Sequence, residues 1–170
     1  MIHQPLTHTD INILTDKERF YCSTRGVIKQ NEKYLVMSVT NPDNTKSSFH
    51  FPGGHIEIGE NAEQALKREI LEEVKCEVNN IKMFAFLENF WEHNGKINHG
   101  LELFFLVNPS CQLETKDYTI IENDKGKLKK LEFKWLASEE LKTFDVRPQI
   151  IKDLILNNDT NKLHHLVQRA

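Results

Sequence analysis

Residues 61–74 have the clearest helical pattern in the chain, and long segments rich in β-branched and aromatic residues lie on both sides of them. Apolar residues recur at helical spacing within this stretch and predict one face that packs against a core. Asn61 suits the N-cap position, and Gln64 follows it at the spacing of a capping box. One strong central helix among predicted strands indicates a mixed sheet flanked by helices, which is an α/β (α+β) fold.

The rest of the chain is predicted to be mostly β-structure. The runs expected to form strands cover residues 21–29, 34–40, 47–51, 81–91, 97–107 and 131–136. Asn94-Gly95 gives a strong hairpin signal between two of these runs. Further helices are expected over 138–143 and 149–156, and a loop with at most a short strand over 109–127. We expect an N-terminal extension over 1–18, one domain over 19–158, and a polar C-terminal tail or short helix over 159–170.

Composition narrows the class of protein. With 170 residues and 39% hydrophobic residues, the chain is long enough to bury the core of one domain. A net charge of −3 argues against a broad basic surface for bulk nucleic acid, although a small basic pocket for phosphate is compatible with it. The three cysteines form no Cys-x-x-Cys pair, so we expect neither a disulfide framework nor a structural zinc site. The sequence has no signal-peptide pattern and no run of about 18 apolar residues, which predicts a cytoplasmic protein with no membrane partner.

Three carboxylates share one face of the predicted helix. Glu69, Glu72 and Glu73 fall within an arc of about 100°. A solvated acidic face is the alternative, and it explains most clusters of this kind. However, Glu73 lies only about 20° from Leu66, within the apolar stripe. Like charges so close together are unfavourable unless a cation lies among them, and Mg²⁺ prefers carboxylate oxygens. The helix is therefore predicted to form one side of a metal site.

The turn Pro52-Gly53-Gly54 ends a predicted strand and leads toward this helix. A simple turn is the alternative interpretation. Because glycine allows a close approach of the backbone to a ligand, a backbone carbonyl of the turn is a candidate for the same cation site.

These residues together resemble the Nudix box, Gly-x5-Glu-x7-Arg-Glu-U-x-Glu-Glu-x-Gly-U, in which U is a bulky aliphatic residue. The matching residues are Gly54, Glu60, Arg68, Glu69, Glu72 and Glu73. Lys75 replaces the family glycine, and Cys76 replaces an aliphatic residue. If Lys75 ends the helix in the left-handed conformation, as the glycine would, we expect a penalty of about 1 kcal/mol. Cys76 is expected to be a small buried hydrophobe.

The resemblance implies an α/β/α sandwich around a mixed sheet and a Mg²⁺-dependent hydrolase, with Mn²⁺ as a possible substitute. It assigns Glu69, Glu72 and Glu73 to metal binding, with the carbonyl of Gly53 as a further ligand. Glu69 is also a candidate base that activates water. Arg68 and Glu60 are expected to orient the helix and the loop before it, and Gly54 to serve the structure of the box. The family often forms dimers, so a homodimer is possible.

Some family members use a base from a distant segment. The candidates here are Glu114, Glu122 and Glu132, and Glu122 is favoured because it lies in the long irregular segment. For each of them an ordinary surface charge is the alternative interpretation, and it explains most such residues. Candidate substrate contacts are Arg25, Phe49, Phe51 and His55, each with a plain surface, core or loop role as the alternative.

The box does not define the substrate. The partner is expected to be a small nucleotide, and a MutT-like nucleoside triphosphate pyrophosphohydrolase is the default. The alternatives are a hydrolase of ADP-ribose or nucleotide sugars and a Nudix domain that senses a nucleotide without cleaving it.

Overall fold

The computed structural model describes residues 12–93, 95–124 and 126–169. The strands are β1 (Asn12–Leu14), β2 (Glu18–Gln30), β3 (Lys33–Thr40), β4 (Val78–His93), β5 (Lys96–Pro109), β6 (Tyr118–Asp124), β7 (Lys127–Ala137) and β8 (His164–Arg169). The helices are α1 (Ala62–Val74), α2 (Ser138–Thr143) and α3 (Gln149–Leu156). Among the described residues, no helix is both long enough and apolar enough to cross a lipid bilayer.

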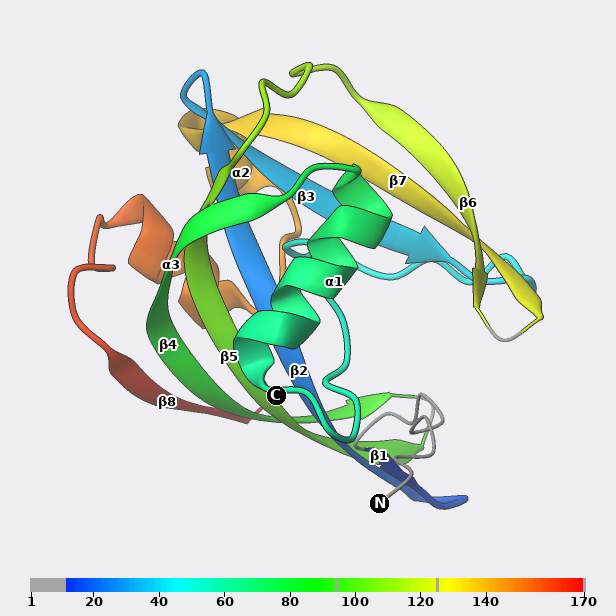
Figure 1. The fold of residues 1–170 in the computed structure, drawn as a ribbon. Helices are drawn as coiled ribbons and strands as arrows, with labels where there is room; N and C mark the ends of the chain where they lie inside the picture. Colours follow the sequence, from blue (N-terminus) through cyan, green and yellow to red (C-terminus); the bar gives the residue numbers. More distant parts are fainter. Residues whose placement is uncertain (1–11, 94, 125, 170) are drawn as a thin grey trace, which may run out of the picture.

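The strands form one mixed sheet in the order β6-β7-β3-β2-β5-β4-β8, with β1 paired to β2. The pairs β2–β5 and β4–β8 are parallel, and the other pairs are antiparallel. Helix α1 crosses one face of the sheet, and α2 and α3 lie on the opposite face (Figure 1). The predicted fold class, an α/β/α sandwich around a mixed sheet, is confirmed.

Each face of the sheet has its own hydrophobic core. Val27 packs with Leu141 of α2 and Ile151 of α3, whereas the adjacent Ile28 packs with Leu66 and Ile70 of α1. Successive side chains of a strand point to opposite faces, so neighbouring apolar residues enter different cores. A central strand that is covered on both sides therefore has a continuous apolar run instead of an alternating one.

The sheet opens between β2 and β3, which pair only at the end near their turn. The segment after β3 fills this opening with backbone hydrogen bonds to both strands. The amides of Gly26 and Thr24 in β2 donate to the carbonyls of Pro52 (2.8 Å) and Gly54 (2.9 Å). On the other side, His50 pairs with β3 through one isolated bridge. The glycine turn is thus fixed directly to the centre of the sheet.

The strand expected over residues 47–51 is not formed. The segment makes only isolated bridges, His50 with Met37 and Phe49 with Val146. Pro52 has no amide to donate, and the chain must turn there toward α1, so a longer ladder cannot continue.

Helix α1 has the predicted bounds and caps. The Asn61 side chain accepts from the amide of Gln64, and the Gln64 side chain accepts from the amide of Asn61, so both halves of the capping box are present. Lys75 ends the helix in the left-handed conformation, with φ 59° and ψ 30°. The expected non-glycine left-handed residue is confirmed.

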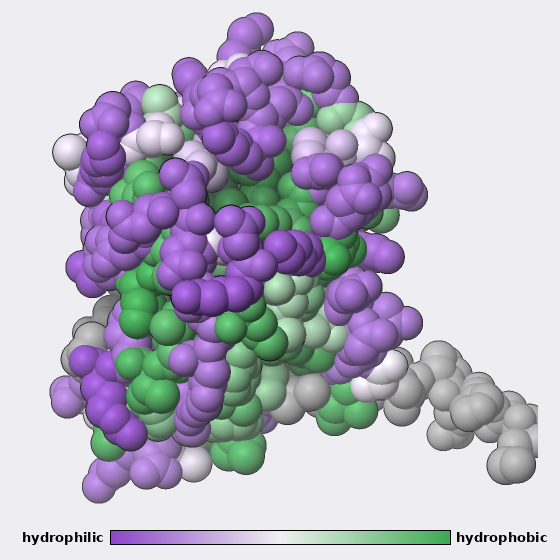
Figure 2. Space-filling model, turned by 90° about the vertical axis from the view of Figure 1, so that its left-hand side faces the viewer, coloured by the Kyte–Doolittle hydropathy of each residue, from purple (hydrophilic) through white to green (hydrophobic). Residues whose placement is uncertain are grey.

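Both termini differ from the sequence-based expectation. The expected tail over 159–170 contains β8, an edge strand parallel to β4, so the sheet continues beyond residue 158. Alternate β8 side chains are exposed, including Val167. On the side of the molecule that lies to the left in Figure 1, hydrophobic surface is visible between hydrophilic side chains (Figure 2). The expected extension over 1–18 contains β1 and the first residue of β2, and residues 1–11 lie outside the described part. The irregular segment 109–127 contains β6.

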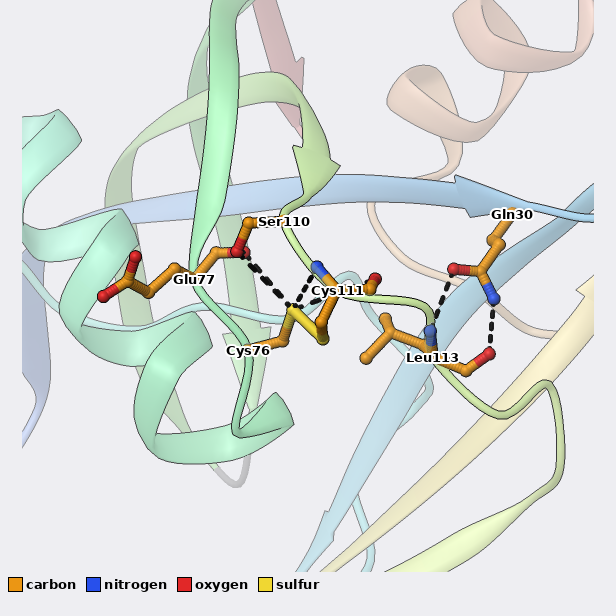
Figure 3. The surroundings of a disulfide bond; sticks show 6 residues. All are labelled: Gln30, Cys76, Glu77, Ser110, Cys111 and Leu113. Atoms are coloured by element: carbon orange, nitrogen blue, oxygen red, sulfur yellow. Dashed lines mark hydrogen bonds between the residues drawn. A yellow bond between two sulfur atoms is a disulfide. The ribbon is translucent and has the colours of Figure 1, made fainter.

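No disulfide framework was expected, but one pair of cysteines is cross-linked. Cys76 and Cys111 form a disulfide with their Cα atoms 6.2 Å apart, and Cys22 is free. Antiparallel pairing of β4 with β5 brings the ends of these strands together, and the carbonyl of Glu77 accepts hydrogen bonds from the amide and the hydroxyl of Ser110, both at 2.8 Å (Figure 3). Cys76 is buried as expected, but as half of a cross-link.

Candidate active site

A pocket of about 310 Å³ lies on the α1 side of the sheet, beside the opening between β2 and β3. Its walls come from β2, the glycine turn, α1 and the β6–β7 hairpin. The lining residues are Arg25, Met37, Val39, His50, Gly53, Gly54, His55, Glu57, Arg68, Glu69, Glu72, Glu73, Glu122, Lys129 and Leu131. The structure thus brings the three helix carboxylates and both glycines of the turn to one cavity.

Both glycines are required by close contacts. A Cβ at Gly53 would lie 2.3 Å from the carbonyl oxygen of Thr24, and Gly53 has a φ of +130°, which other residues rarely adopt. A Cβ at Gly54 would lie 2.4 Å from Oε1 of Glu69. The turn can therefore lie against β2 only because Gly53 has no side chain, and the Glu69 carboxylate can lie against the turn because Gly54 has none.

Glu73 is the most buried of the three carboxylates, with 5% of its surface exposed. Its Oε2 accepts a hydrogen bond of 2.9 Å from the amide of Gly53. Burial, followed by the charge of Glu69, raises the pKa of Glu73 well above its usual range. The apolar stripe of α1 positions this side chain inward, so the carboxyl lies at the inner end of the pocket.

Glu69 is also largely buried, and its Oε1 lies 2.8 Å from Nη1 of Arg68. Burial raises the pKa of Glu69, and the adjacent Arg68 opposes that change. Glu72 lies at the rim, with 55% of its side chain exposed and Oε2 3.7 Å from Nη1 of Arg68. The three carboxylates therefore differ in burial although they share one helix face.

Arg68 connects α1 to the loop before it. Its Nη2 donates to Oε1 of Glu60 at 2.6 Å and to the carbonyl of His55 at 3.1 Å. The same Glu60 oxygen accepts from the amide of Glu57 at 2.8 Å. The geometry therefore agrees with an orienting role for Arg68 and Glu60, because their pairing fixes residues 55–60 to the helix.

Arg25 reaches the pocket from β2 and donates a hydrogen bond to the carbonyl of Gly53. That carbonyl, which the resemblance assigns to a metal, thus accepts from a guanidinium in this arrangement. Nη1 of Arg25 is also 3.3 Å from Nδ1 of His50. Burial and the charge of Arg25 lower the pKa of His50 to about 3, so its ring is neutral at physiological pH.

The carboxylates of α1 have the chemistry of a hard-cation site, since Mg²⁺ prefers oxygen ligands. The raised pKa values of Glu69 and Glu73 indicate two buried acids without enough compensating positive charge. Among the described residues, however, no three His, Cys, Asp or Glu side chains are close enough together to hold an ion. Glu69 is turned toward Arg68 and Glu73 toward the Gly53 amide. The donor set fits a divalent cation in chemistry, and its carboxylates would exchange these partners for the ion.

The three distal carboxylates lie in different places. Glu122 lines the pocket from β6 and contributes to the raised pKa of Glu73. Glu132 lies between Leu131 and Phe133, which face α1, so it points to the opposite face, where it pairs with Lys46 at 2.8 Å. Glu114 lines a separate cavity near the end of α1. Of the three, only Glu122 is in reach of the helix carboxylates.

The candidate substrate contacts also separate. Arg25 and His55 line the pocket. Nε2 of His55 lies 3.1 Å from Nη2 of Arg19, and the His55 ring packs against the ring of Tyr21. Phe51 is fully buried in the core that contains α2 and α3, and Phe49 packs against Phe144. The expectation that both phenylalanines border the site is wrong, because their side chains turn into the hydrophobic core.

Sequence reasoning missed several lining residues, namely Met37, Val39, His50, Glu57, Lys129 and Leu131. Lys129 had a usable signal. Leu131, Phe133 and Trp135 alternate along β7 and share one core. By the same alternation, Lys129 lies next on this face of the strand, and it is charged. Val39 and Met37 had no such signal, because strands that are buried on both faces do not reveal which side a residue takes.

Comparison with known proteins decides the family. The model of the NUDIX domain matches residues 21–154. The chain belongs to the Nudix family of hydrolases. The match covers the sheet from β2 to most of α3, including every residue of the box.

Solved structures of Nudix proteins have the same fold at low sequence identity. A MutT protein from Bacillus halodurans has a TM-score of 0.58 and 16% identity, over 87% of this chain and 90% of that chain. An ADP-ribose pyrophosphatase from Streptococcus suis has a TM-score of 0.54 and 15% identity, over 86% and 98%. A UDP-X diphosphatase has a TM-score of 0.55 and 15% identity, over 85% and 66%. At these identities the likeness shows the Nudix fold alone.

Proposed function

We propose that this Nudix protein hydrolyses a phosphoanhydride bond of a nucleoside triphosphate in a divalent-cation-dependent reaction, as a MutT-like pyrophosphohydrolase. The observation that carries the proposal is the meeting of the buried Glu73 and the largely buried Glu69 with the glycine turn in one pocket. Buried acids with raised pKa values are typical of functional sites. The intact box residues support catalysis over a sensing role.

Glu69, Glu72 and Glu73 would hold Mg²⁺, with Mn²⁺ as a substitute, and the Gly53 carbonyl would add a ligand. A bound divalent cation supplies positive charge to the phosphate oxygens. The role of the protein is then to place that charge. Before the ion binds, Glu73 accepts from the Gly53 amide at the inner end and Glu69 lies against Gly54, so both carboxyls already face the pocket. Arg25 donates to the Gly53 carbonyl in this arrangement, a contact that the ion would replace.

We assign the general base to Glu69. Glu69 lines the pocket, is largely buried and lies against the glycine turn, so its carboxylate can face a water molecule in the pocket. Glu122 is the alternative base, because it enters the same pocket from the opposite wall on β6. Arg68 pairs with Glu69 in this arrangement and orients it, so its loss would affect the base as well as the loop.

A panel of substrates tests the reaction. The purified protein is incubated with Mg²⁺ or Mn²⁺ and nucleoside triphosphates, ADP-ribose, nucleotide sugars or dinucleoside polyphosphates, and the products are separated. We expect pyrophosphate and a nucleoside monophosphate from the triphosphates. Two of the similar structures are named for ADP-ribose and UDP-linked substrates, so preferred turnover of those compounds would identify the alternative hydrolase.

The helix carboxylates are tested by Glu72→Gln, which removes one charged ligand at the exposed rim. We expect kcat to fall on the order of 100-fold, because the cation is then held less firmly and compensates the charge on the phosphate oxygens less well. Glu63→Gln is the matched control, because Glu63 is an exposed acid of the same helix outside the pocket. Full activity of Glu72→Gln would contradict the assignment of Glu72. Tight nucleotide binding by the wild type without turnover would favour the sensor. A cytoplasmic location and a homodimer remain predictions.

A further inference from the structure

We propose that a second cavity, near the end of α1, binds a small uncharged aromatic heterocycle through ring contacts and a hydrogen bond from the indole N–H of Trp135. The cavity has a volume of about 330 Å³. Its lining residues are Val74, Leu113, Glu114, Lys116, Asp117, Tyr118 and Trp135. The active-site pocket is lined by a different set of residues, so the inference does not depend on the proposed reaction.

The cavity is large enough for two fused rings. A cavity of about 150 Å³ already holds a benzene molecule, and sites for small molecules typically begin at about 300 Å³. Such sites are mainly apolar and contain a few polar groups that fix the orientation of the ligand. The shape therefore suits a compact ring system, and the side chains of the lining define its chemistry.

The wall formed by residues 113–117 is fixed to the rest of the protein. The disulfide joins the segment just before this wall to the end of α1. The side chain of Gln30 accepts from the amide of Leu113 at 3.1 Å and donates to its carbonyl at 2.5 Å (Figure 3). At the other end of the wall, Asp117 accepts from the amide of Trp135 at 3.1 Å. The cavity is thus formed before a ligand arrives, which reduces the entropic cost of binding.

The charged residues of the lining are already compensated. Glu114 and Lys116 pair with each other at 3.4 Å, and their side chains are 84% and 82% exposed, so this pair lies toward solvent. One oxygen of Asp117 accepts from Nζ of Lys134 at 3.1 Å, and the other accepts from the amide of Trp135. A charged ligand would lose its hydration without gaining an opposite charge that is free to pair with it. The lining therefore favours an uncharged ligand.

Tyr118 and Trp135 supply two aromatic rings to the cavity. The Tyr118 ring stacks on Phe133, with the ring centroids 4.5 Å apart and 6° between the ring planes. This stack holds the Tyr118 ring in one orientation, and Val74 and Leu113 add aliphatic surface. Aromatic rings prefer offset-stacked or edge-to-face contacts with other rings. A flat ring system therefore fits this lining better than a flexible chain.

The indole N–H of Trp135 gives the site its polar group. Trp135 is 4% exposed, and its Nε1 has no hydrogen-bond partner among the described residues. A buried donor without an acceptor is unfavourable, and native structures nearly always supply a partner. A ring nitrogen or a carbonyl oxygen of the ligand would be that partner. The ligand class is therefore an uncharged aromatic heterocycle with at least one acceptor atom.

Benzothiazole is the probe for this site, because it is an uncharged pair of fused rings with an acceptor nitrogen. Benzothiophene has the same shape with a C–H in place of that nitrogen and is the control probe. The chain has two tryptophans, so a proton–nitrogen correlation spectrum has two indole signals, and Trp135→Phe identifies that of Trp135. We expect benzothiazole to move this signal downfield with a Kd on the order of 1 mM. The signal of Trp91, which lies on β4, should stay in place, and benzothiophene should cause no downfield shift.

Two variants test the cavity and the hydrogen bond separately. Leu113→Phe fills part of the cavity and should abolish the response, whereas the same substitution at Leu128, an exposed residue of β7, is the matched control. By calorimetry, Trp135→Phe should weaken the binding of benzothiazole about 10-fold more than that of benzothiophene. Equal thermal unfolding midpoints for the two leucine variants would show that both are folded.

Several outcomes would overturn the assignment of this site. They are a Trp135 signal that does not respond to benzothiazole, equal responses to the two probes, and an unchanged Kd in Leu113→Phe. Binding is measured on the full chain without nucleotide or metal. A protein that binds benzothiazole in this way but cleaves no nucleotide would therefore contradict the hydrolase proposal and leave the second site in place.

Discussion

Gly54 and Glu69 lie in such close contact that a methyl group on the glycine would occupy the space of the carboxylate. A Cβ at Gly54 would be 2.4 Å from Oε1, 2.5 Å from Cδ and 2.7 Å from Oε2 of Glu69. These contacts are shorter than any that real Cβ atoms make, so one partner must move. The turn is held to β2 by the hydrogen bond from the amide of Thr24 to the carbonyl of Gly54, so the carboxylate is the freer of the two.

Replacement of Gly54 by Ala is therefore expected to displace Glu69 and leave the fold nearly intact. A shift of about 1 Å in a proposed base can lower kcat on the order of 100-fold. We expect that loss in steady-state kinetics, with a small change in the denaturant midpoint. Gly95→Ala is the control, because nothing lies within 4 Å of its Cβ position, and its φ of +73° predicts only a small loss of stability. Wild-type kinetics of Gly54→Ala would show that Glu69 is not positioned by this contact.

Loss of the Arg68 side chain should both destabilise the protein and reduce activity. The Arg68–Glu60 pair is mostly buried, with 21% and 17% of the two side chains exposed. Arg68→Ala leaves the Glu60 carboxylate without this partner, and we expect the free energy of unfolding to fall by about 2–3 kcal/mol. Urea denaturation measures this change. Lys142→Ala removes an exposed ion pair with Glu139 and should change it by less than about 0.5 kcal/mol. Equal changes in the free energy of unfolding for the two variants would contradict a stabilising role of the Arg68–Glu60 pair.

Local signals explain why the sequence predicted α1 and the centre of the site so well. The capping box of Asn61 and Gln64 and the apolar stripe act within a few turns of one helix, so they depend little on the rest of the fold. The box residues lie on that helix and on the loop that leads into it. Their meeting in one pocket therefore needs only a chain reversal at residues 53–60.

Features that depend on strand register could not be predicted in this way. The hairpin turn places Glu92 opposite Ile97, and an unbroken ladder would place Cys76 opposite Leu113. Two irregularities in β4, after Asn79 and after Met83, shift the register so that the ladder ends with Val78 opposite Pro109. Cys76 then meets Cys111. Such bulges cannot be predicted from the spacing of the cysteines in the sequence.

The prediction of substrate contacts was limited because the sequence does not show which face of the sheet a side chain takes. Phe49 and Phe51 precede the glycine turn, but their side chains enter the core with α2 and α3. These outcomes depend on how the chain passes through the opening between β2 and β3, which is a tertiary property. Lys129 reaches the pocket through the β6–β7 hairpin, and the sequence indicated at most a short strand before β7.

The buried carboxyl of Glu73 should make stability depend on pH. Its pKa in the folded protein is raised above the ordinary value of 4.5, by burial first and then by Glu69. The folded state therefore binds this proton more tightly than the unfolded state. No penalty exists below pH 4.5, and the free energy of unfolding falls as the pH rises from there toward the raised pKa.

Glu73→Gln removes this penalty and keeps an oxygen that can accept from the Gly53 amide. We expect the variant to be more stable than the wild type at pH 8 by at least about 1 kcal/mol, and the difference to be smaller at pH 5. Urea denaturation in metal-free buffer at both pH values measures it. The variant should also lose activity, since the proposed cation loses a ligand. A stability advantage that shrinks as the pH rises would show that Glu73 is not a strained buried acid.

The disulfide should stabilise the segment that joins β5 to β6. It spans 35 residues and ties the end of α1 to residue 111, and two residues later the Gln30 side chain holds the backbone of Leu113 with hydrogen bonds of 2.5 and 3.1 Å. Removal of a cross-link over a loop of this length releases about 3–4 kcal/mol in the chain-entropy description. For Cys111→Ser we expect the midpoint of thermal unfolding to fall by roughly 10 °C.

Dithiothreitol should lower the midpoint of the wild type by a similar amount and leave Cys111→Ser unchanged. Cys22→Ser is the matched control, because Cys22 is the free cysteine and its variant should respond to the reductant as the wild type does. Disulfides persist mainly in oxidising compartments, so a cytoplasmic enzyme would work with this pair reduced and with the lower midpoint. A wild-type midpoint that is the same with and without dithiothreitol would show that the cross-link contributes nothing to stability, and the hydrogen bonds of Ser110 and Gln30 would then hold the segment alone.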